Sequence, residues 1–107
     1  MKEVRIKDFD FKHNDNYFSI DANVFFELVE DTTMHEVHGS IVEEDTSYYD
    51  NPKVEDLTIY LYLLDENKYV HINRNMTTWV IELQGIFEIA SIKAVNYAIN
   101  ALSFNIR

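Results

Sequence analysis

The chain has 107 residues, no cysteine and a net charge of −10 at pH 7. This length suits a single domain over residues 1–107, and a chain without cysteine has neither disulfide bonds nor thiolate metal ligands. The first residues contain no apolar run of signal-peptide length, and no segment approaches the roughly 20 apolar residues of a membrane span. We therefore expect a cytoplasmic protein without membrane insertion.

The charge is distributed unevenly. Ten carboxylates and no lysine or arginine lie between His13 and Pro52. Such a field repels nucleic acid and attracts basic partners, so we expect no direct binding of DNA or RNA. A charged surface also keeps a strand-rich protein soluble, and the sequence leaves both interpretations of the acidity open.

The first two predicted elements are strands at residues 3–11 and 18–28, joined by a loop at 13–16. In the first strand the apolar residues change phase between Ile6 and Phe9, which predicts a β-bulge near Lys7 and Asp8. In the second, large apolar residues alternate with polar ones over the longest run of the chain, which is typical of a strand with one buried face. The apolar positions of that strand are Phe18, Ile20, Ala22, Val24, Phe26 and Leu28.

The middle of the chain is predicted to form further strands separated by polar segments. A turn at 30–33 precedes a third strand at 35–42, and an acidic loop at 43–54 contains the turn residues Asn51 and Pro52. At 57–63, leucines and Ile59 alternate with Tyr60 and Tyr62, which predicts a fourth strand. A short strand at 69–72 follows.

The C-terminal third is predicted to form a strand at 79–89 and a helix at 90–104. In the strand every second residue is large and apolar or glycine, whereas in the helix small and apolar residues recur at Ala90, Ala94, Ala98 and Leu102. The expected fold is α+β, with an antiparallel β-sheet meander and the C-terminal helix packed on one face.

Residues for catalysis or metal binding are few. The chain has no glycine-rich phosphate loop, no Gly-x-Ser-x-Gly and no His-Glu-x-x-His motif, so we expect neither an enzyme nor a cofactor. His35 and His38 would point to opposite faces of one strand and could not share a metal ion. Asp8 and Asp10 share a strand face and could hold a hard cation, but a solvated face is the simpler interpretation.

Aromatic residues are abundant, with seven tyrosines and seven phenylalanines. Tyr60, Tyr62 and Tyr69 fall on the strand phase opposite the core leucines, which indicates a contact surface. The alternative is that the helix or a neighbouring subunit covers these rings, and we expect a homo-oligomer because one helix can cover only one sheet face.

The acidic loop offers a second candidate surface. Two tyrosines inside a ring of carboxylates suit the surface of a basic protein, although a solvated loop would have the same composition. The residues concerned are Glu43, Glu44, Asp45, Tyr48, Tyr49 and Asp50.

Two segments resemble one known family. Residues 82–92, Glu-Leu-Gln-Gly-Ile-Phe-Glu-Ile-Ala-Ser-Ile, resemble the stretch of SecB export chaperones in which the last long sheet strand enters the first helix. Residues 7–11, Lys-Asp-Phe-Asp-Phe, are similar to the first strand of that family. The resemblance implies a SecB-like fold, unfolded polypeptide clients, no cofactor, and contact with the translocation motor through Asp8 and Glu82.

The first functional hypothesis is a non-catalytic, SecB-like chaperone that holds exposed apolar segments of another polypeptide. The alternative is an acidic inhibitor or immunity protein, whose acidic loop would mimic phosphates and block a nucleic-acid-binding enzyme such as a nuclease or toxin. A small assembly module without a client is a third possibility.

Overall fold

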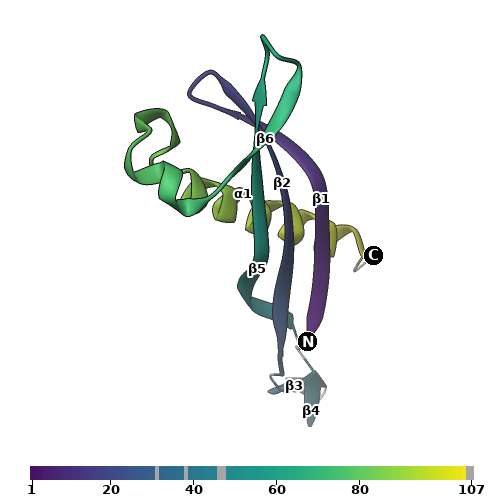
Figure 1. Ribbon diagram of the computed structural model, residues 1–107. Coiled ribbons are helices and arrows are strands. Elements are labelled where there is room, and N and C mark those ends of the chain that lie inside the picture. The colour runs from purple at the N-terminus through teal and green to yellow at the C-terminus, as the bar shows by residue number, and fades with distance from the viewer. Residues whose placement is uncertain (31, 38, 46–47, 106–107) are drawn as a thin grey trace.

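The computed structural model describes residues 1–30, 32–37, 39–45 and 48–105, with the backbone only for 32–37, 40–45 and 103–105. A four-stranded antiparallel sheet has the order β1-β2-β5-β6, and β3 and β4 form a separate hairpin (Figure 1). The α+β fold class with an antiparallel sheet is confirmed. The strands are β1 (Lys2–His13), β2 (Asn16–Val29), β3 (Thr32–Val37), β4 (Ser40–Asp45), β5 (Tyr48–Leu63) and β6 (Lys68–Ile72); the helices are the 3-10 turns η1 (Arg74–Thr78) and η2 (Ile81–Leu83) and the helix α1 (Ile86–Asn105).

The first hairpin forms as predicted. Asn14 and Asp15 both have positive φ, 49° and 62°, as a tight two-residue turn matched to the strand twist requires. The register shifts between Ile6 and Phe9, which confirms the bulge near Lys7 and Asp8. Asp8 is the bulged residue with φ of 54°, and its backbone N–H donates a 2.8 Å hydrogen bond to Oδ1 of Asp21.

Strand β5 is much longer than the predicted strand at 57–63, and the predicted loop at 43–54 is wrong for its described residues, 43–45 and 48–54, which belong to β4 and β5. The pairing of β5 with β2 contains two bulges, where Asn51 and Asp56 each have φ of 55°. Each extra residue reverses the alternation of side chains, which is why this half of the strand has the composition of a loop. Pro52 lies at one of these bulges, a position where a strand tolerates proline.

The predicted single strand at 35–42 is also wrong, because β3 and β4 form a hairpin there. Gly39 lies between them with φ of 82°, a conformation that favours glycine. The sequence alternation continues across this turn and therefore conceals it. The predicted position of His38 lies outside the described residues.

The predicted strand at 79–89 is wrong as well. Residues 74–78 and 81–83 form η1 and η2, Gly85 has φ of 75°, and α1 begins at Ile86. Trp79 and Ile81, which share the predicted strand phase, are 78% and 77% exposed. The buried residues of the segment are Leu83, Ile86, Phe87 and Ala90, whose spacing of three and four is helical.

Helix α1 crosses one face of the sheet and closes the core. Figure 1 shows it running across β5, β2 and β1, and the contacts of α1 with these three strands agree. Its buried stripe contains the four predicted positions Ala90, Ala94, Ala98 and Leu102. The alanines allow the helix to approach the sheet closely, against buried side chains that include Ile20, Val24 and Ile59.

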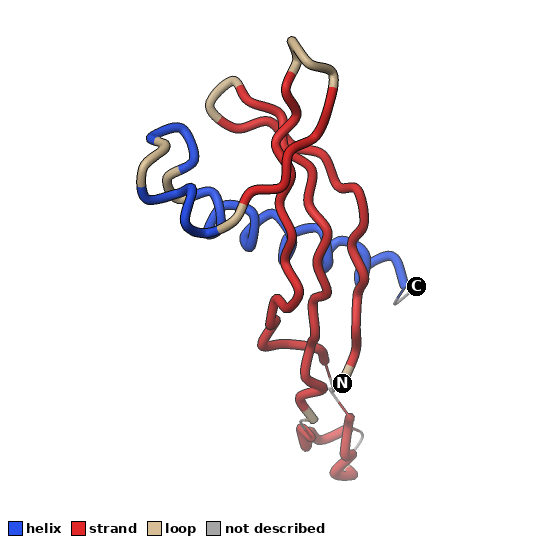
Figure 2. Tube along the Cα trace, in the orientation of Figure 1, coloured by secondary structure: helices blue, strands red, loops and turns tan. Residues whose placement is uncertain are grey.

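The molecule is elongated, with principal extents of 70 × 26 × 22 Å. Figure 2 shows why: the long strands extend beyond the helix at both ends, with the β3–β4 hairpin at one of them. Among the residues described, no helix has the length and apolar character needed to cross a membrane.

Candidate functional site

The sheet face opposite α1 is not covered by any described element. Two rows of side chains cross it at right angles to the strands, because residues paired across antiparallel strands point to the same face. We call this surface the open face. Its rows are Asp10, Ser19, Tyr60 and His71, and next to them Lys12, Tyr17, Tyr62 and Tyr69.

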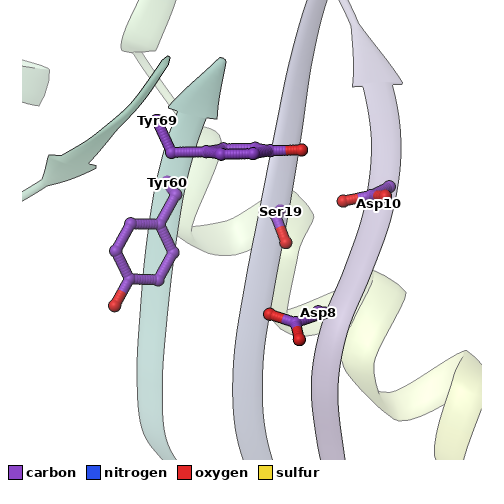
Figure 3. Close-up of a pocket in the computed structure, with 5 residues that line it drawn as sticks. All are labelled: Asp8, Asp10, Ser19, Tyr60 and Tyr69. Carbon is purple, nitrogen blue, oxygen red and sulfur yellow. The ribbon is translucent and has the colours of Figure 1, made fainter. Parts of the chain in front are cut away.

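A hollow of about 290 Å³ lies on the open face (Figure 3). It is lined by Asp8 and Asp10 from β1, Ser19 from β2, Tyr60 from β5 and Tyr69 from β6. Figure 3 shows the Tyr69 ring reaching across β5 with its hydroxyl directed toward β1, while the carboxylate of Asp10 points back from the other side. We call this hollow the open-face pocket.

The β1 bulge lets the strand bury Ile6 without turning the carboxylates of the pocket into the core. Without it, Asp8 and Asp10 would still share a face, but Ile6 and Phe9 would point to opposite sides of the sheet. The bulge therefore lets Ile6 and Phe11 enter the core together while Asp8 and Asp10 remain on the open face. The hydrogen bond from the Asp8 backbone to Asp21 fixes this local geometry.

The aromatic rings of the open face contact one another across strands. The ring centroids of Tyr62 and Tyr69 are 5.0 Å apart, and those of Tyr60 and His71 are 5.7 Å apart. The Tyr62 hydroxyl also hydrogen-bonds to Asn67 in the β5–β6 turn. These contacts limit the rotamers of the rings, so the surface is partly ordered before any partner arrives.

The pocket carries uncompensated negative charge. Within the described part of the chain, neither the Asp8 nor the Asp10 carboxylate accepts a hydrogen bond or forms an ion pair. Lys12, in the row next to Asp10, lies 3.9 Å from Asp15 and 5.6 Å from the centroid of the Tyr17 ring, and Lys7, next to Asp8 in the chain, lines a different hollow with Asp21. Further along β1, the pKa of Arg5 is raised by its hydrogen bond to Glu3, so that guanidinium stays charged.

The structure brings some of the predicted site residues together and separates others. Tyr60 and Tyr69 meet Asp8 at the open-face pocket, and Tyr62 lies in the adjacent row. Glu82 lies in η2, and Figure 1 places the turns before α1 beyond the opposite sheet edge from β1. Asp8 and Glu82, paired by the resemblance, therefore do not form one surface.

The predicted acidic aromatic loop is not a loop. Glu43, Glu44 and Asp45 belong to β4, and their side chains lie outside the described residues. Tyr48 and Tyr49 are exposed and begin β5, where they pair with the end of β2. Asp50, also exposed, is part of the same strand end.

Metal-binding geometry is absent from the described residues. They contain no group of three or more histidine, aspartate or glutamate side chains placed to hold a metal ion. Asp8 and Asp10 are two carboxylates flanked by aromatic rings, and hard cations in proteins usually have six to eight oxygen ligands. The donor set therefore does not fit a dedicated cation site.

Ser19 is the residue of the pocket that sequence reasoning missed. It is the buried polar residue of the described core, 6% exposed, in a run of otherwise apolar neighbours. The strand pattern places it on the face of Asp21 and Asn23, but only the register with β1 and β5 shows that it forms the floor of a hollow.

Comparison of the chain with family models, with curated proteins and with solved structures gives no match. The function is therefore inferred from the residues of the chain itself.

Proposed function

We propose that this chain is a non-catalytic binding protein that holds an extended, exposed segment of another polypeptide against the open face. The observation that carries this proposal is the presence of four tyrosines on the sheet face that α1 leaves uncovered. They are Tyr17, Tyr60, Tyr62 and Tyr69.

The exposed area supports a partner of this kind. The accessible surface is 7865 Å². A compact monomer of this mass exposes about 6,200 Å², so the excess is about 1,600 Å². That excess is about twice the roughly 800 Å² that one partner buries in a standard protein–protein interface.

The chemistry of the open face favours a polypeptide over a small apolar ligand. Tyrosine buries a large ring at low entropic cost and keeps a hydroxyl that can bond to the backbone of a bound chain. The uncompensated carboxylates of the open-face pocket add attraction for basic segments. No cofactor or nucleotide is needed for this mode of reversible capture.

The proposed mode of action is that of SecB-like chaperones. Residues 82–92, which carry the resemblance to that family, form η2, the turn at Gly85 and the start of α1. The open face therefore supports the binding role. The relationship to SecB-like chaperones is a second proposal, and the binding role does not depend on it. We include a homo-oligomer in the proposal, because exposed apolar residues before α1 offer a second surface for another copy of the chain.

The test is a binding measurement with two matched variants. Tyr69 lies on the open face and is 54% exposed, whereas Tyr48 lies at the far end of β5 and is 51% exposed. The probe is a fluorescently labelled model protein held unfolded by reduction and neutral alkylation, followed by anisotropy. Tyr69→Ser should weaken binding about tenfold, which corresponds to about 1.4 kcal/mol, and Tyr48→Ser should leave it unchanged. Equal affinity of the two variants would contradict the proposal.

The second candidate function, an acidic inhibitor of a nucleic-acid-binding enzyme, is favoured by the exposed end of β5. Tyr48, Tyr49 and Asp50 lie there, near the hairpin that contains Glu43 and Glu44. For this function a basic partner would lose affinity steeply with salt, and Tyr48→Ser would be the harmful variant. The pair of tyrosine variants therefore separates the two candidates.

A further inference from the structure

We propose that the open-face pocket receives the side chain of an arginine in the bound polypeptide. This inference rests on the proposed function and names the residue type that the open face selects. It starts from the composition of the hollow: two carboxylates, two tyrosine rings and one hydroxyl, contributed by all four strands of the sheet.

The pocket contains polar groups without partners. Ser19 is 6% exposed as a residue, and its hydroxyl makes no hydrogen bond to any residue the structure describes. Among the described side chains no polar atom is both sealed from solvent and unbonded, so this hydroxyl is open to the hollow. Figure 3 shows this side chain at the floor of the hollow, directed into it. A hydroxyl that faces a hollow can accept a hydrogen bond from a bound group in place of water, so the floor is suited to accept a donor from outside.

The walls specify the charge and shape of that donor. Asp8 and Asp10 stand on one side of the hollow and the Tyr69 ring on the other (Figure 3). A cation between them would gain from both carboxylates and from the negative face of a tyrosine ring. Lys12 is directed to Asp15 and Tyr17, and Lys7 lines a different hollow, so neither lysine fills the site.

Arginine fits this arrangement better than lysine or a metal ion. Its guanidinium is planar and stacks on aromatic rings, and its five N–H donors spread widely enough to serve separate acceptors. Lysine offers a compact, strongly hydrated charge that cannot bridge acceptors in the same way. Because Asp8 and Asp10 are separate positions along β1, with Ser19 below them, a spread donor set matches the pocket.

The test uses four synthetic peptides that differ at one position. Each is an acetylated nine-residue peptide of alternating valine and serine with arginine, citrulline, lysine or alanine at its centre, and binding is measured by isothermal titration calorimetry. Citrulline has the shape of arginine without the charge. We expect the arginine peptide to bind about tenfold more tightly than the citrulline and alanine peptides, and about threefold more tightly than the lysine peptide.

Matched variants assign the preference to the pocket. Asp10→Asn keeps the shape of the side chain, and it should reduce the preference for arginine over citrulline to about twofold. Asp8→Asn should act in the same direction, because asparagine also tolerates the positive φ at this bulge. Asp50→Asn removes the same charge at the far end of β5 and should leave the preference unchanged.

The outcomes separate this inference from the proposed function. If all four peptides bind equally, the arginine site is refuted and the polypeptide-binding role stands. If none binds and the unfolded model protein does not bind either, the proposed function itself is refuted. Equal binding of the arginine and lysine peptides would show that the pocket detects charge alone, which overturns the preference for arginine. Loss of the preference in Asp50→Asn would assign it to the overall field of the protein.

Discussion

Replacing Gly85 with alanine should destabilise the protein by about 1 kcal/mol. Gly85 has φ of 75°, where a residue with a Cβ atom pays about 1–2 kcal/mol. No atom lies within 4 Å of the position that the new Cβ would take, so the cost comes from the backbone alone. Alanine has less conformational freedom than glycine in the unfolded chain, which stabilises the folded protein by about 0.4–1 kcal/mol. The free energy of unfolding therefore falls by about 1 kcal/mol in total.

The sign of this effect distinguishes the turn from a strand. In an extended strand at 79–89, alanine would stabilise the protein, since glycine weakens the interior of a strand. Urea unfolding followed by circular dichroism measures the difference. With a slope of about 2 kcal/mol per molar urea, Gly85→Ala should lower the midpoint by about 0.5 M. Gly85→Asn should lower it less, because asparagine tolerates positive φ, and a rise in the midpoint with alanine would refute the turn at Gly85.

Three further predictions concern stability and assembly. Ile59→Ala should cost about 2–5 kcal/mol in urea unfolding, because Ile59 is fully buried between the sheet and α1; a loss below about 1 kcal/mol would contradict this core. Asp21→Ala should cost about 1 kcal/mol and speed hydrogen exchange at the Asp8 amide, since it removes the acceptor at the bulge; unchanged exchange would argue against that bond. Trp79→Ser should change stability by less than about 0.5 kcal/mol, because the side chain is 78% exposed. It should lower the particle mass in light scattering if the exposed apolar segment before α1 joins two copies of the chain. A mass that stays above that of the monomer would show that the copies meet at another surface.

The first hairpin was predictable because its pattern is local and uninterrupted. Alternation from Phe18 to Phe26 identifies the buried face of β2, and the change of phase in β1 locates the bulge at Asp8. The helical stripe from Ala90 to Leu102 was equally clear. In each case the pattern of a few consecutive residues is enough to predict which face of one strand or helix is buried.

The elements that were missed have patterns that fit more than one structure. From Leu83 to Phe87 the apolar residues satisfy a period of two and a helical period at once, and only burial against the sheet decides between them. In β5 the bulges at Asn51 and Asp56 interrupt the alternation and make a strand look like a polar loop.

The candidate site was predictable in part. The phase of Tyr60 and Tyr62 relative to the buried Ile59 can be obtained from the strand itself. The open-face pocket, in contrast, depends on the register that places Ser19 between Asp10 and Tyr60. Such pairings join residues far apart in the chain, and one sequence carries no direct signal of them.

The most direct test of the central claim is a nuclear magnetic resonance titration of the isotopically labelled chain with the nine-residue arginine peptide. The proposal predicts that the largest amide shift changes lie in the rows of the open face, around Ser19, Tyr60 and Tyr69, and that the buried stripe of α1 changes little. Changes concentrated at the end of β5 around Tyr48, or on the exposed side of α1, would contradict the assignment of the open face as the binding surface.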